Sequence, residues 1–381
     1  QAGVGAHNGD DIHNAYTLAE LIAHLNTIPD DFTDHRVFYL CGDFQLSSSF
    51  TVNDLDASLQ YQMYFLGRTP DGSADQRITM DAQGGAFTAI KLRAGIGLGI
   101  TEDVFFRNIA IRNTNKLSGN NGWEFEGCTR IHLLECTAED VFVGFHNLNG
   151  SSGQIQLTRS TAKNCASHGF YWFEPPGSPV VTCWPQECAA IQCGGDGFRG
   201  ITYPTRCLAA LNGGMGFNQQ WFSSHCTAHG NGSHGFSCVN DLIRQVGSLR
   251  CLSTGNGGYG WQTDVGGNNL HLLGCASLNN TLGRNSNPAS IVDYDPVLLS
   301  MNPYMDAAGL NFELNDVEGG GLPCKNLAGL VFPDGKSVSY HAIGASQPCC
   351  LVTPTVGVGG PWAYEFGIAK LFRFPGKQRK L

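Results

Sequence analysis

The most informative pattern in the sequence is a short motif that returns along the middle of the chain. It begins with Cys-x-Ala or a close variant, passes through a stretch of turn-forming residues, and ends on Gly followed by an aromatic residue. Clear copies run CTAEDVFVGF (136–145), STAKNCASHGF (160–170), CAAIQCGGDGF (188–198), CLAALNGGMGF (207–217), CTAHGNGSHGF (226–236) and CLSTGNGGYGW (251–261). A weaker first copy starts at Asn113, and a last one starts at Cys275 without the Gly-aromatic end.

The spacing of these copies predicts a solenoid. They begin 19 to 28 residues apart, and a repeated unit of about 20 to 25 residues is typical of stacked supersecondary units. The strand signals within each unit are short, Asn and Gly turns are dense, and helical periodicity is absent between 100 and 285. Leucine-rich repeats share this period, but their fixed Leu ladder is missing. We therefore predict an all-β chain that forms a right-handed parallel β-helix, with one coil per unit.

A β-helix coil advances by one strand spacing, about 4.8 Å, so equivalent residues should stack in columns. We expect the aromatic residue of each copy to point inward and the residue after it to point outward. The inward aromatic column would be Phe145, Phe170, Phe198, Phe217, Phe236 and Trp261.

The cysteines follow the same logic. Cys136, Cys188, Cys207, Cys226, Cys251 and Cys275 should form a second inward column. The 15 cysteines could instead form a disulfide framework, but an inward stack fits free thiols, which behave as small buried hydrophobes. Cys349 and Cys350 are the better place for a bridge.

The two ends of the chain differ from the middle. Apolar residues in 16–28 have helical spacing, which predicts an N-terminal capping helix, and the strands should begin with 36–52. We expect an N-terminal cap at 1–35, the parallel β-helix at 36–285, terminal coils and a closing segment at 286–346, and an irregular C-terminal tail at 347–381. The tail is apolar, so it should cover either the last coil or a neighbouring subunit of a homo-oligomer, such as a trimer.

Composition limits the partners. A net charge of −9 argues against nucleic acid, which needs a basic surface. No stretch approaches the ~20 apolar residues of a membrane span. Three histidines, His225, His229 and His234, lie close in sequence but lack the spacing of a tetrahedral site, so we expect no metal and no other cofactor.

The ends also resemble a known family. Asp10-Asp11, the helical stretch and VFYLCGDFQL (37–46) resemble the opening of pectate-lyase-like β-helix proteins. DYDPVLLSMNPYMDAAGLNFELNDVEGGG (293–321) and YHAIGAS (340–346) resemble the closing segment of bacterial and viral β-helix repeat proteins, including surface and spike types. The resemblance covers most of residues 10–346. It implies the pectin lyase-like fold and an extracellular, cell-surface or virion location, but its motifs are weak for function.

Candidate ligand contacts follow the Gly-aromatic step. The next position in each copy gives an outward polar ladder of Glu124, His146, Tyr171, Arg199, Asn218, Ser237 and Gln262. The longest insertion, 171–185, adds aromatic side chains. Rings can stack on sugar faces while polar groups bond to hydroxyls, although the same rings could simply pack the insertion onto its coil. The predicted ligand-binding residues are Glu124, His146, Tyr171, Trp172, Trp184 and Arg199.

Glycoside hydrolysis needs two carboxyl groups about 5 to 9.5 Å apart. We consider Glu124 with Glu126, and Asp196 with Glu174 or Asp264, and take the last three as the candidate catalytic residues. The acidic motif set of polygalacturonase-like hydrolases and the Asp clusters of calcium-dependent lyases are both missing.

The sequence therefore favours a surface-exposed or virion-associated structural or adhesive protein, such as a spike, fibre or filament component, which is not an enzyme. Its faces would bind glycans or other copies of the chain. The alternative is a polysaccharide lyase or glycoside hydrolase acting on an extracellular polysaccharide. Fold alone does not decide between them.

Overall fold

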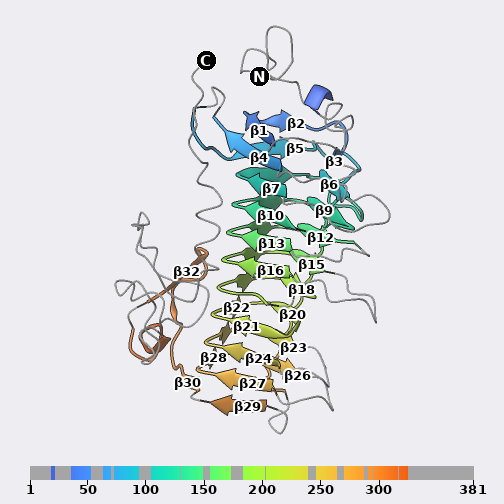
Figure 1. The fold of residues 1–381 in the computed structure, drawn as a ribbon. Coiled ribbons are helices and arrows are strands. Elements are labelled where there is room, and N and C mark those ends of the chain that lie inside the picture. Colours follow the sequence, from blue (N-terminus) through green and yellow to red (C-terminus); the bar gives the residue numbers. More distant parts are fainter. Residues whose placement is uncertain are drawn as a thin grey trace.

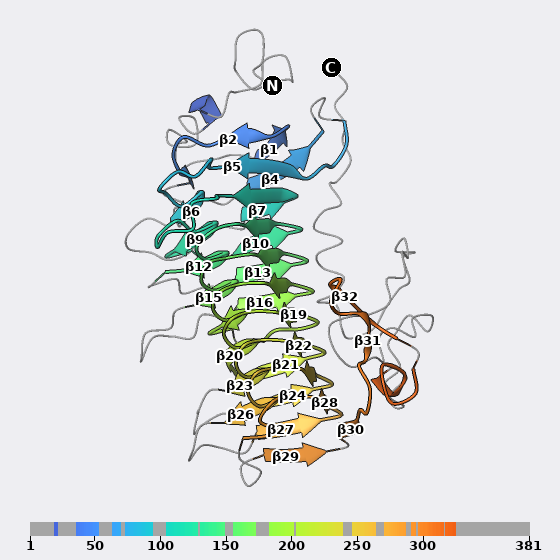
Figure 2. The ribbon, with the colours of Figure 1, turned by 180° about the vertical axis from the view of Figure 1, so that it is seen from behind.

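The chain coils into a stack of parallel strands (Figures 1 and 2). The computed structural model describes residues 19–21, 36–52, 63–69, 73–93, 104–128, 130–148, 155–172, 183–201, 203–238, 246–263, 270–286, 291–294, 296–315 and 317–324. Successive coils supply strands to three sheets, here called A, B and C, and each strand pairs in parallel with its equivalent in the next coil. The parallel β-helix predicted from the repeat is confirmed, while its right-handedness and the division into four segments stay predictions.

Sheet A has two parts. The first contains β1 (Arg36–Cys41), β4 (Met63–Arg68), β7 (Val104–Arg107), β10 (Ile131–Leu134), β13 (Ile155–Thr158) and β16 (Cys183–Gln186). The second contains β21 (Phe222–Ser224), β24 (Val246–Leu249), β27 (Leu270–Leu273) and β29 (Ile291–Tyr294). In the short coil between the two parts, the strand is reduced to Thr205, which bridges Gln186 and Ser224.

Sheets B and C run without this interruption. Sheet B contains β2 (Phe44–Gln45), β5 (Ile78–Asp81), β8 (Ile109–Arg112), β11 (Thr137–Glu139), β14 (Thr161–Lys163), β17 (Ala189–Ile191), β19 (Leu208–Ala210), β22 (Thr227–His229), β25 (Leu252–Thr254), β28 (Ala276–Leu278) and β30 (Val297–Leu298). Sheet C contains β3 (Phe50–Val52), β6 (Ile90–Arg93), β9 (Trp123–Glu126), β12 (Phe145–Asn147), β15 (Phe170–Trp172), β18 (Phe198–Arg199), β20 (Phe217–Gln220), β23 (Phe236–Cys238) and β26 (Trp261–Thr263).

The aromatic column is confirmed. The six predicted rings are buried, and their neighbouring centroids lie 4.6 to 5.4 Å apart with nearly parallel planes. Trp123 continues the column one coil earlier, stacking on Phe145 at 6.2 Å. The column thus fills the side of the interior that lies behind sheet C.

The cysteine column is confirmed as well. All six thiols are buried, and Ser160 occupies the equivalent position in the coil between Cys136 and Cys188. Every cysteine among the described residues is free. Burial raises the pKa of the Cys136 thiol to about 12. Cys349 and Cys350 lie outside the described residues.

A third interior column consists of asparagines. The Asn212 Nδ2 amide donates to Asn231 Oδ1 at 2.9 Å, Asn231 donates to Asn256 at 2.9 Å, and Asn256 donates to Asn280 at 2.8 Å. These side chains are buried, so the ladder of mutual hydrogen bonds removes the cost of unpaired amides in the interior.

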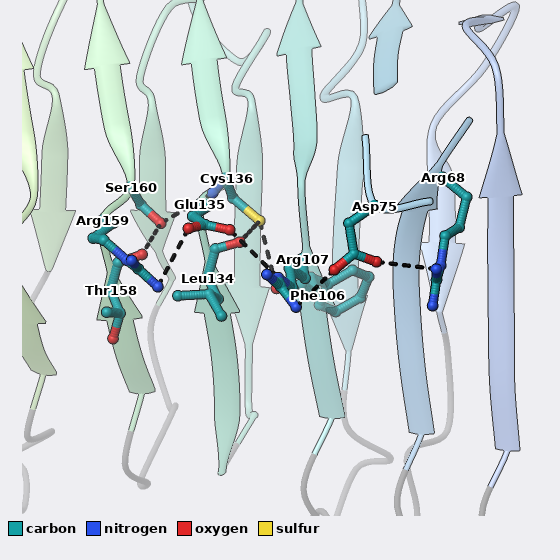
Figure 3. Close-up of polar contacts among 10 residues, drawn as sticks. All are labelled: Arg68, Asp75, Phe106, Arg107, Leu134, Glu135, Cys136, Thr158, Arg159 and Ser160. Carbon is teal, nitrogen blue, oxygen red and sulfur yellow. Dashed lines mark hydrogen bonds and ion pairs between the residues drawn. The ribbon is translucent and has the colours of Figure 1, made fainter. Parts of the chain in front are cut away.

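A charged ladder follows the bend between sheets A and B. In six consecutive coils the bend residue before the cysteine column is not glycine yet has a positive φ of 48 to 57°. These residues are Glu135, Arg159, Glu187, Arg206, His225 and Arg250. Figure 3 shows charges of alternating sign beside this bend, with Arg107 bonded to Asp75 at 3.0 Å and Glu135 bonded to Arg107 at 3.3 Å and to Arg159 at 3.2 Å.

The ends are described only in part. Residues 19–21 are helical and Leu21 joins the core, but the rest of the predicted capping helix lies outside the described residues. After β30, the antiparallel strands β31 (Tyr304–Asp306) and β32 (Asn311–Leu314) and the 3-10 turn η3 (Leu322–Cys324) follow. Tyr304 bonds Thr254 on the outer face of sheet B at 3.0 Å. The predicted tail, 347–381, also lies outside the described residues.

Within the described part of the chain, no helix has the length and hydropathy needed to cross a bilayer.

We predict that the folded protein protects nearly all its thiols. Twelve of the 13 described cysteines are buried, whereas Cys41 is half-buried, so Cys41 should be the only one of them to react quickly with a thiol reagent. Denaturation should release most of the 15. Titration of wild type and Cys41→Ser, before and after denaturation, measures this. Disulfides at Cys188, Cys207, Cys226 or Cys251 in mass spectra would disprove the free column.

Phe217→Ala should destabilise the fold by about 3 to 5 kcal/mol, because it opens a cavity inside the aromatic column. Phe217 is fully buried, with ring neighbours 4.8 and 4.9 Å away. The matched control is Phe222→Ala, since Phe222 is 40% exposed, and it should cost less than about 1 kcal/mol. Urea unfolding of both variants provides the comparison, and equal losses would contradict the inward assignment of Phe217.

Candidate functional site

The polar ladder lies on the outer face of sheet C. Glu124, His146, Tyr171, Arg199 and Asn218 stand in register on β9, β12, β15, β18 and β20. The alternation that sends the aromatic column inward turns these side chains outward. They are less exposed than the sequence suggests: Glu124 is buried and the other four are half-buried, because residues from the preceding turns lie against them.

Glu124 is held by three groups. Its Oε2 atom accepts hydrogen bonds from Thr88 Oγ1 at 3.2 Å and Asn121 Nδ2 at 3.0 Å. The Lys91 ammonium on β6 lies 3.9 Å from Oε1. These donors use much of the bonding capacity of the carboxylate, so Glu124 is suited to orienting its neighbours.

The principal neighbour is His146. Asn121 Nδ2 lies 3.1 Å from His146 Nδ1. Because the same amide nitrogen donates to Glu124, the Asn121 side chain presents its N–H₂ to the ring, which makes Nδ1 an acceptor and leaves the proton on Nε2. Burial lowers the pKa of His146, which favours this neutral form. His146 therefore carries an N–H donor without a positive charge.

Tyr171 lies between His146 and Arg199. Its ring stacks on the His146 imidazole with centroids 5.1 Å apart and planes 6° apart. On the next coil, Arg199 Cζ lies 5.4 Å from the Tyr171 ring centroid, within cation–π range. A neutral imidazole, a phenol and a guanidinium thus occupy successive coils in mutual contact.

Asp196 belongs to the turn that precedes β18. Its Oδ1 accepts from the backbone N–H of Met215 at 2.8 Å, and its Oδ2 accepts from Asn218 Nδ2 at 2.9 Å. The backbone N–H of Asp196 donates to His168 Nδ1 at 2.9 Å. Both carboxylate oxygens thus help to fix the next coil, and the assignment of Asp196 as catalytic stays a prediction.

His168 is a structural side chain of the same kind. Burial is the main cause of its lowered pKa, and its Nδ1 accepts the Asp196 backbone bond. His234 does the same for the backbone N–H of Tyr259, at 2.8 Å. The two His-Gly pairs of the repeat thus serve the turns, although His168 also lies against Tyr171 with centroids 5.0 Å apart.

The remaining predicted residues lie elsewhere. Glu174 and Asp264 are outside the described residues. Trp172 is 1% exposed and points into the core, so we correct its assignment as a ligand contact. Trp184 is half-buried on β16 of sheet A and is not part of the polar ladder.

Sequence reasoning missed the groups that support the ladder, chiefly Thr88, Lys91 and Asn121. A signal for one of them was present. The position two residues before each inward aromatic residue packs beside the ladder, and it contains Asn121, Val143, His168, Asp196, Met215, His234 and Tyr259. Comparing this position across copies would have shown that polar side chains accompany most coils of the ladder, with Val143 and Met215 as the apolar exceptions.

The spacing of carboxylates limits the chemistry. Glu124 and Arg199 are three strands apart in sheet C, so about 14 Å separates Glu124 from the coil of Asp196. Glu124 and Glu126 are two residues apart on β9, or about 7 Å. Glu126 is bound to Arg93 at 2.8 Å. Among the described residues, no group of three His, Cys, Asp or Glu side chains could hold a metal ion.

Comparison with solved structures agrees with the coil architecture. The chain is similar to pectate lyase Pel9A over 91% of its own length and 94% of that chain, with a TM-score of 0.60 and 13% identity. The chain has the pectate-lyase-like parallel β-helix fold. At this identity the similarity shows the fold alone.

Looser similarities extend to two further β-helix proteins. A rhamnogalacturonan lyase has a TM-score of 0.47 at 12% identity, with 74% of this chain and 86% of that chain covered. The A-module of the Azotobacter vinelandii mannuronan C-5 epimerase AlgE4 has a TM-score of 0.45 at 14% identity, with 73% and 76% covered. No family model and no curated protein sequence matches the chain.

The buried imidazole predicts a pH dependence of stability. Because burial lowers the pKa of His146 in the folded state, the unfolded chain takes up a proton first as the pH falls below about 6.5. The preferential protonation of His146 in the unfolded chain is therefore absent above about pH 6.5, and below that pH it lowers the free energy of unfolding of the β-helix. His146→Gln should lose less stability than wild type between pH 7 and pH 5 in urea unfolding. Equal losses would show that His146 titrates normally.

Proposed function

We propose that this β-helix is a polysaccharide lyase that cleaves a chain of carboxylated sugars on the polar ladder. The observation that carries the proposal is the contact series His146, Tyr171 and Arg199 on three successive coils. It brings a neutral N–H donor, a phenol and a cation within reach of one sugar unit. The shared fold with a protein named pectate lyase supports the same class of reaction.

Each of these three side chains has a role in the proposed β-elimination. The C5–H proton is removed, its electron pair forms the C4–C5 double bond, the C4–O bond breaks, and the leaving oxygen takes up a proton. Arg199 pairs with the sugar carboxylate, and His146 Nε2–H donates to the same developing charge, which stabilises it. Tyr171 acts in its phenolate form, which takes the C5 proton, and the resulting phenol donates that proton to the leaving oxygen.

The second candidate is an inverting glycoside hydrolase. Glu124 and Glu126 are about 7 Å apart along β9, inside the range of about 6.5 to 9.5 Å for an inverting pair. Both, however, face a cation of β6, Lys91 and Arg93 respectively, and they lie side by side on one strand. An inverting hydrolase needs its two carboxyl groups on opposite sides of the glycosidic bond, and two glutamates on one strand do not provide this. We therefore prefer the lyase to the hydrolase.

The lyase replaces the adhesive or structural protein as our main proposal. A spike or fibre needs a flat, stable face, but it has no use for a neutral imidazole held by an oriented amide. The extracellular, cell-surface or virion location remains a proposal, since polysaccharide of this kind lies outside cells. Assembly into a trimer likewise remains a proposal.

Tyr171→Phe tests the lyase directly, because it removes the phenolic oxygen and keeps the stacked ring. We expect cleavage of the best substrate among polygalacturonate, alginate and rhamnogalacturonan to fall by about 10²- to 10⁴-fold. Arg199→Gln should also reduce cleavage, whereas Glu126→Gln serves as the matched control and should retain it. Ultraviolet absorbance of unsaturated sugar ends measures the reaction. Saturated products, with activity lost in Glu126→Gln and kept in Tyr171→Phe, would favour the hydrolase instead.

A further inference from the structure

Aromatic side chains gather on the outer face of the second part of sheet A and on the connections that lead into it. We call this set the aromatic strip, and it consists of Tyr203, Trp221, Phe222, His271 and Tyr294. Tyr203 is 39% exposed, Phe222 is 40% exposed and Tyr294 is 49% exposed. The other two are half-buried. The strip crosses five coils, so it extends over about 19 Å along the axis.

The rings of the strip are held in place. Tyr203 and Trp221 form an edge-to-face pair with centroids 6.0 Å apart, and His271 stacks on Tyr294 at 6.1 Å. Phe222 pairs with Gly247 on the next strand, where an added Cβ would lie 3.3 Å from the Phe222 ring. The glycine therefore lets this ring lie close to the sheet. Rings fixed in this way lose little conformational entropy when they bind a ligand.

The first part of the same sheet behaves differently. There the outward aromatic side chains Tyr64 and Phe105 are stacked at 4.7 Å, but both are buried. On β4 and β7 the outward aromatic residues of sheet A are thus covered, whereas Tyr39 on β1 and three residues of the strip are exposed. Exposed apolar side chains that cluster in this way indicate a binding surface.

The strip follows the polar ladder closely along the chain in two coils. Tyr203 follows Arg199 by four residues in one coil, and Trp221 follows Asn218 by three residues in the next. The connection from sheet C to sheet A is shortest in the second of these coils: one residue separates β20 from β21, whereas four separate β9 from β10, ten separate β15 from β16 and seven separate β23 from β24. In this coil Trp221 is therefore the single residue between the strand of the ladder and the strand of the strip.

We infer that the aromatic strip is a second contact for the polysaccharide, on which the apolar faces of its sugar rings stack. The inference rests on the proposed function and names a binding surface beyond the reacting groups. A sugar chain suits the surface because each ring presents flat C–H faces to aromatic rings and hydroxyls to the solvent. A polymer that reaches from the ladder around the corner of the coil would engage both surfaces, whereas a short oligosaccharide would reach only one.

The test compares polymer with oligosaccharide in single-ring variants. Tyr203→Ala and Phe222→Ala should each weaken binding of the preferred polymer by about 2- to 10-fold in calorimetry or affinity electrophoresis. Their cleavage of a trisaccharide of the same sugar should stay at the wild-type level. Tyr39→Ala is the matched control, because Tyr39 is an exposed tyrosine on β1, at the other end of sheet A and outside the strip, and its loss should change neither property.

The outcomes separate the inference from the proposed function. Normal polymer binding by Tyr203→Ala and Phe222→Ala, with active wild-type lyase, would overturn only the aromatic strip. Binding that depends on the strip without any cleavage would support the strip and reject the lyase. Failure of wild type to bind polygalacturonate, alginate or rhamnogalacturonan would count against both. A change of mass in light scattering with unchanged glycan binding would show that the strip is a contact between copies of the chain.

Discussion

The pairing of each coil with the next in fixed register is the constraint on which the rest of the molecule depends. Backbone hydrogen bonds between coils place equivalent residues one strand spacing apart, so every position has to tolerate a near-copy of itself above and below. The Gly-aromatic step shows the consequence. An added Cβ at Gly169 would lie 2.8 Å from the Cβ of Ala190, so glycine in one column and alanine in the next allow the turn and sheet B to approach each other.

The same register explains which parts of the fold could be predicted. The aromatic and cysteine columns are visible in the sequence because identical residue types return at each coil. The asparagine ladder was missed because asparagine is equally common in exposed turns, and only the coil-to-coil geometry shows Asn231 bonding to Asn256 inside the core. Bends at Glu135 and Arg159 were also hidden, since a positive φ is expected at glycine rather than at a charged residue.

The candidate site was predicted in part for the same reason. The ladder of Glu124, His146, Tyr171 and Arg199 follows from alternation after the aromatic column, and the structure places these residues in one row. Trp172 was misplaced because it was assigned to the insertion, whereas the strand alternation of inward Phe170 and outward Tyr171 continues for one more residue and turns Trp172 inward. The bonds of Asp196 could not be predicted because its partners, among them the backbone N–H of Met215, belong to the following coil.

Coil spacing also decides which chemistry the outer face of sheet C can support. Side chains on adjacent coils are about 4.8 Å apart, which suits proton transfer and charge stabilisation shared among neighbours such as His146, Tyr171 and Arg199. Among the described strands of sheet C, carboxylates occur only on β9, while Lys91, Arg93 and Arg199 supply cations. The chain as a whole has a net charge of −9, so these cations are opposite in sign to the net charge of the protein. Because Lys91 and Arg93 pair with the two acids near one end of sheet C and Arg199 lies near its centre, the central part of the face is better matched to an anionic sugar chain than to a neutral one.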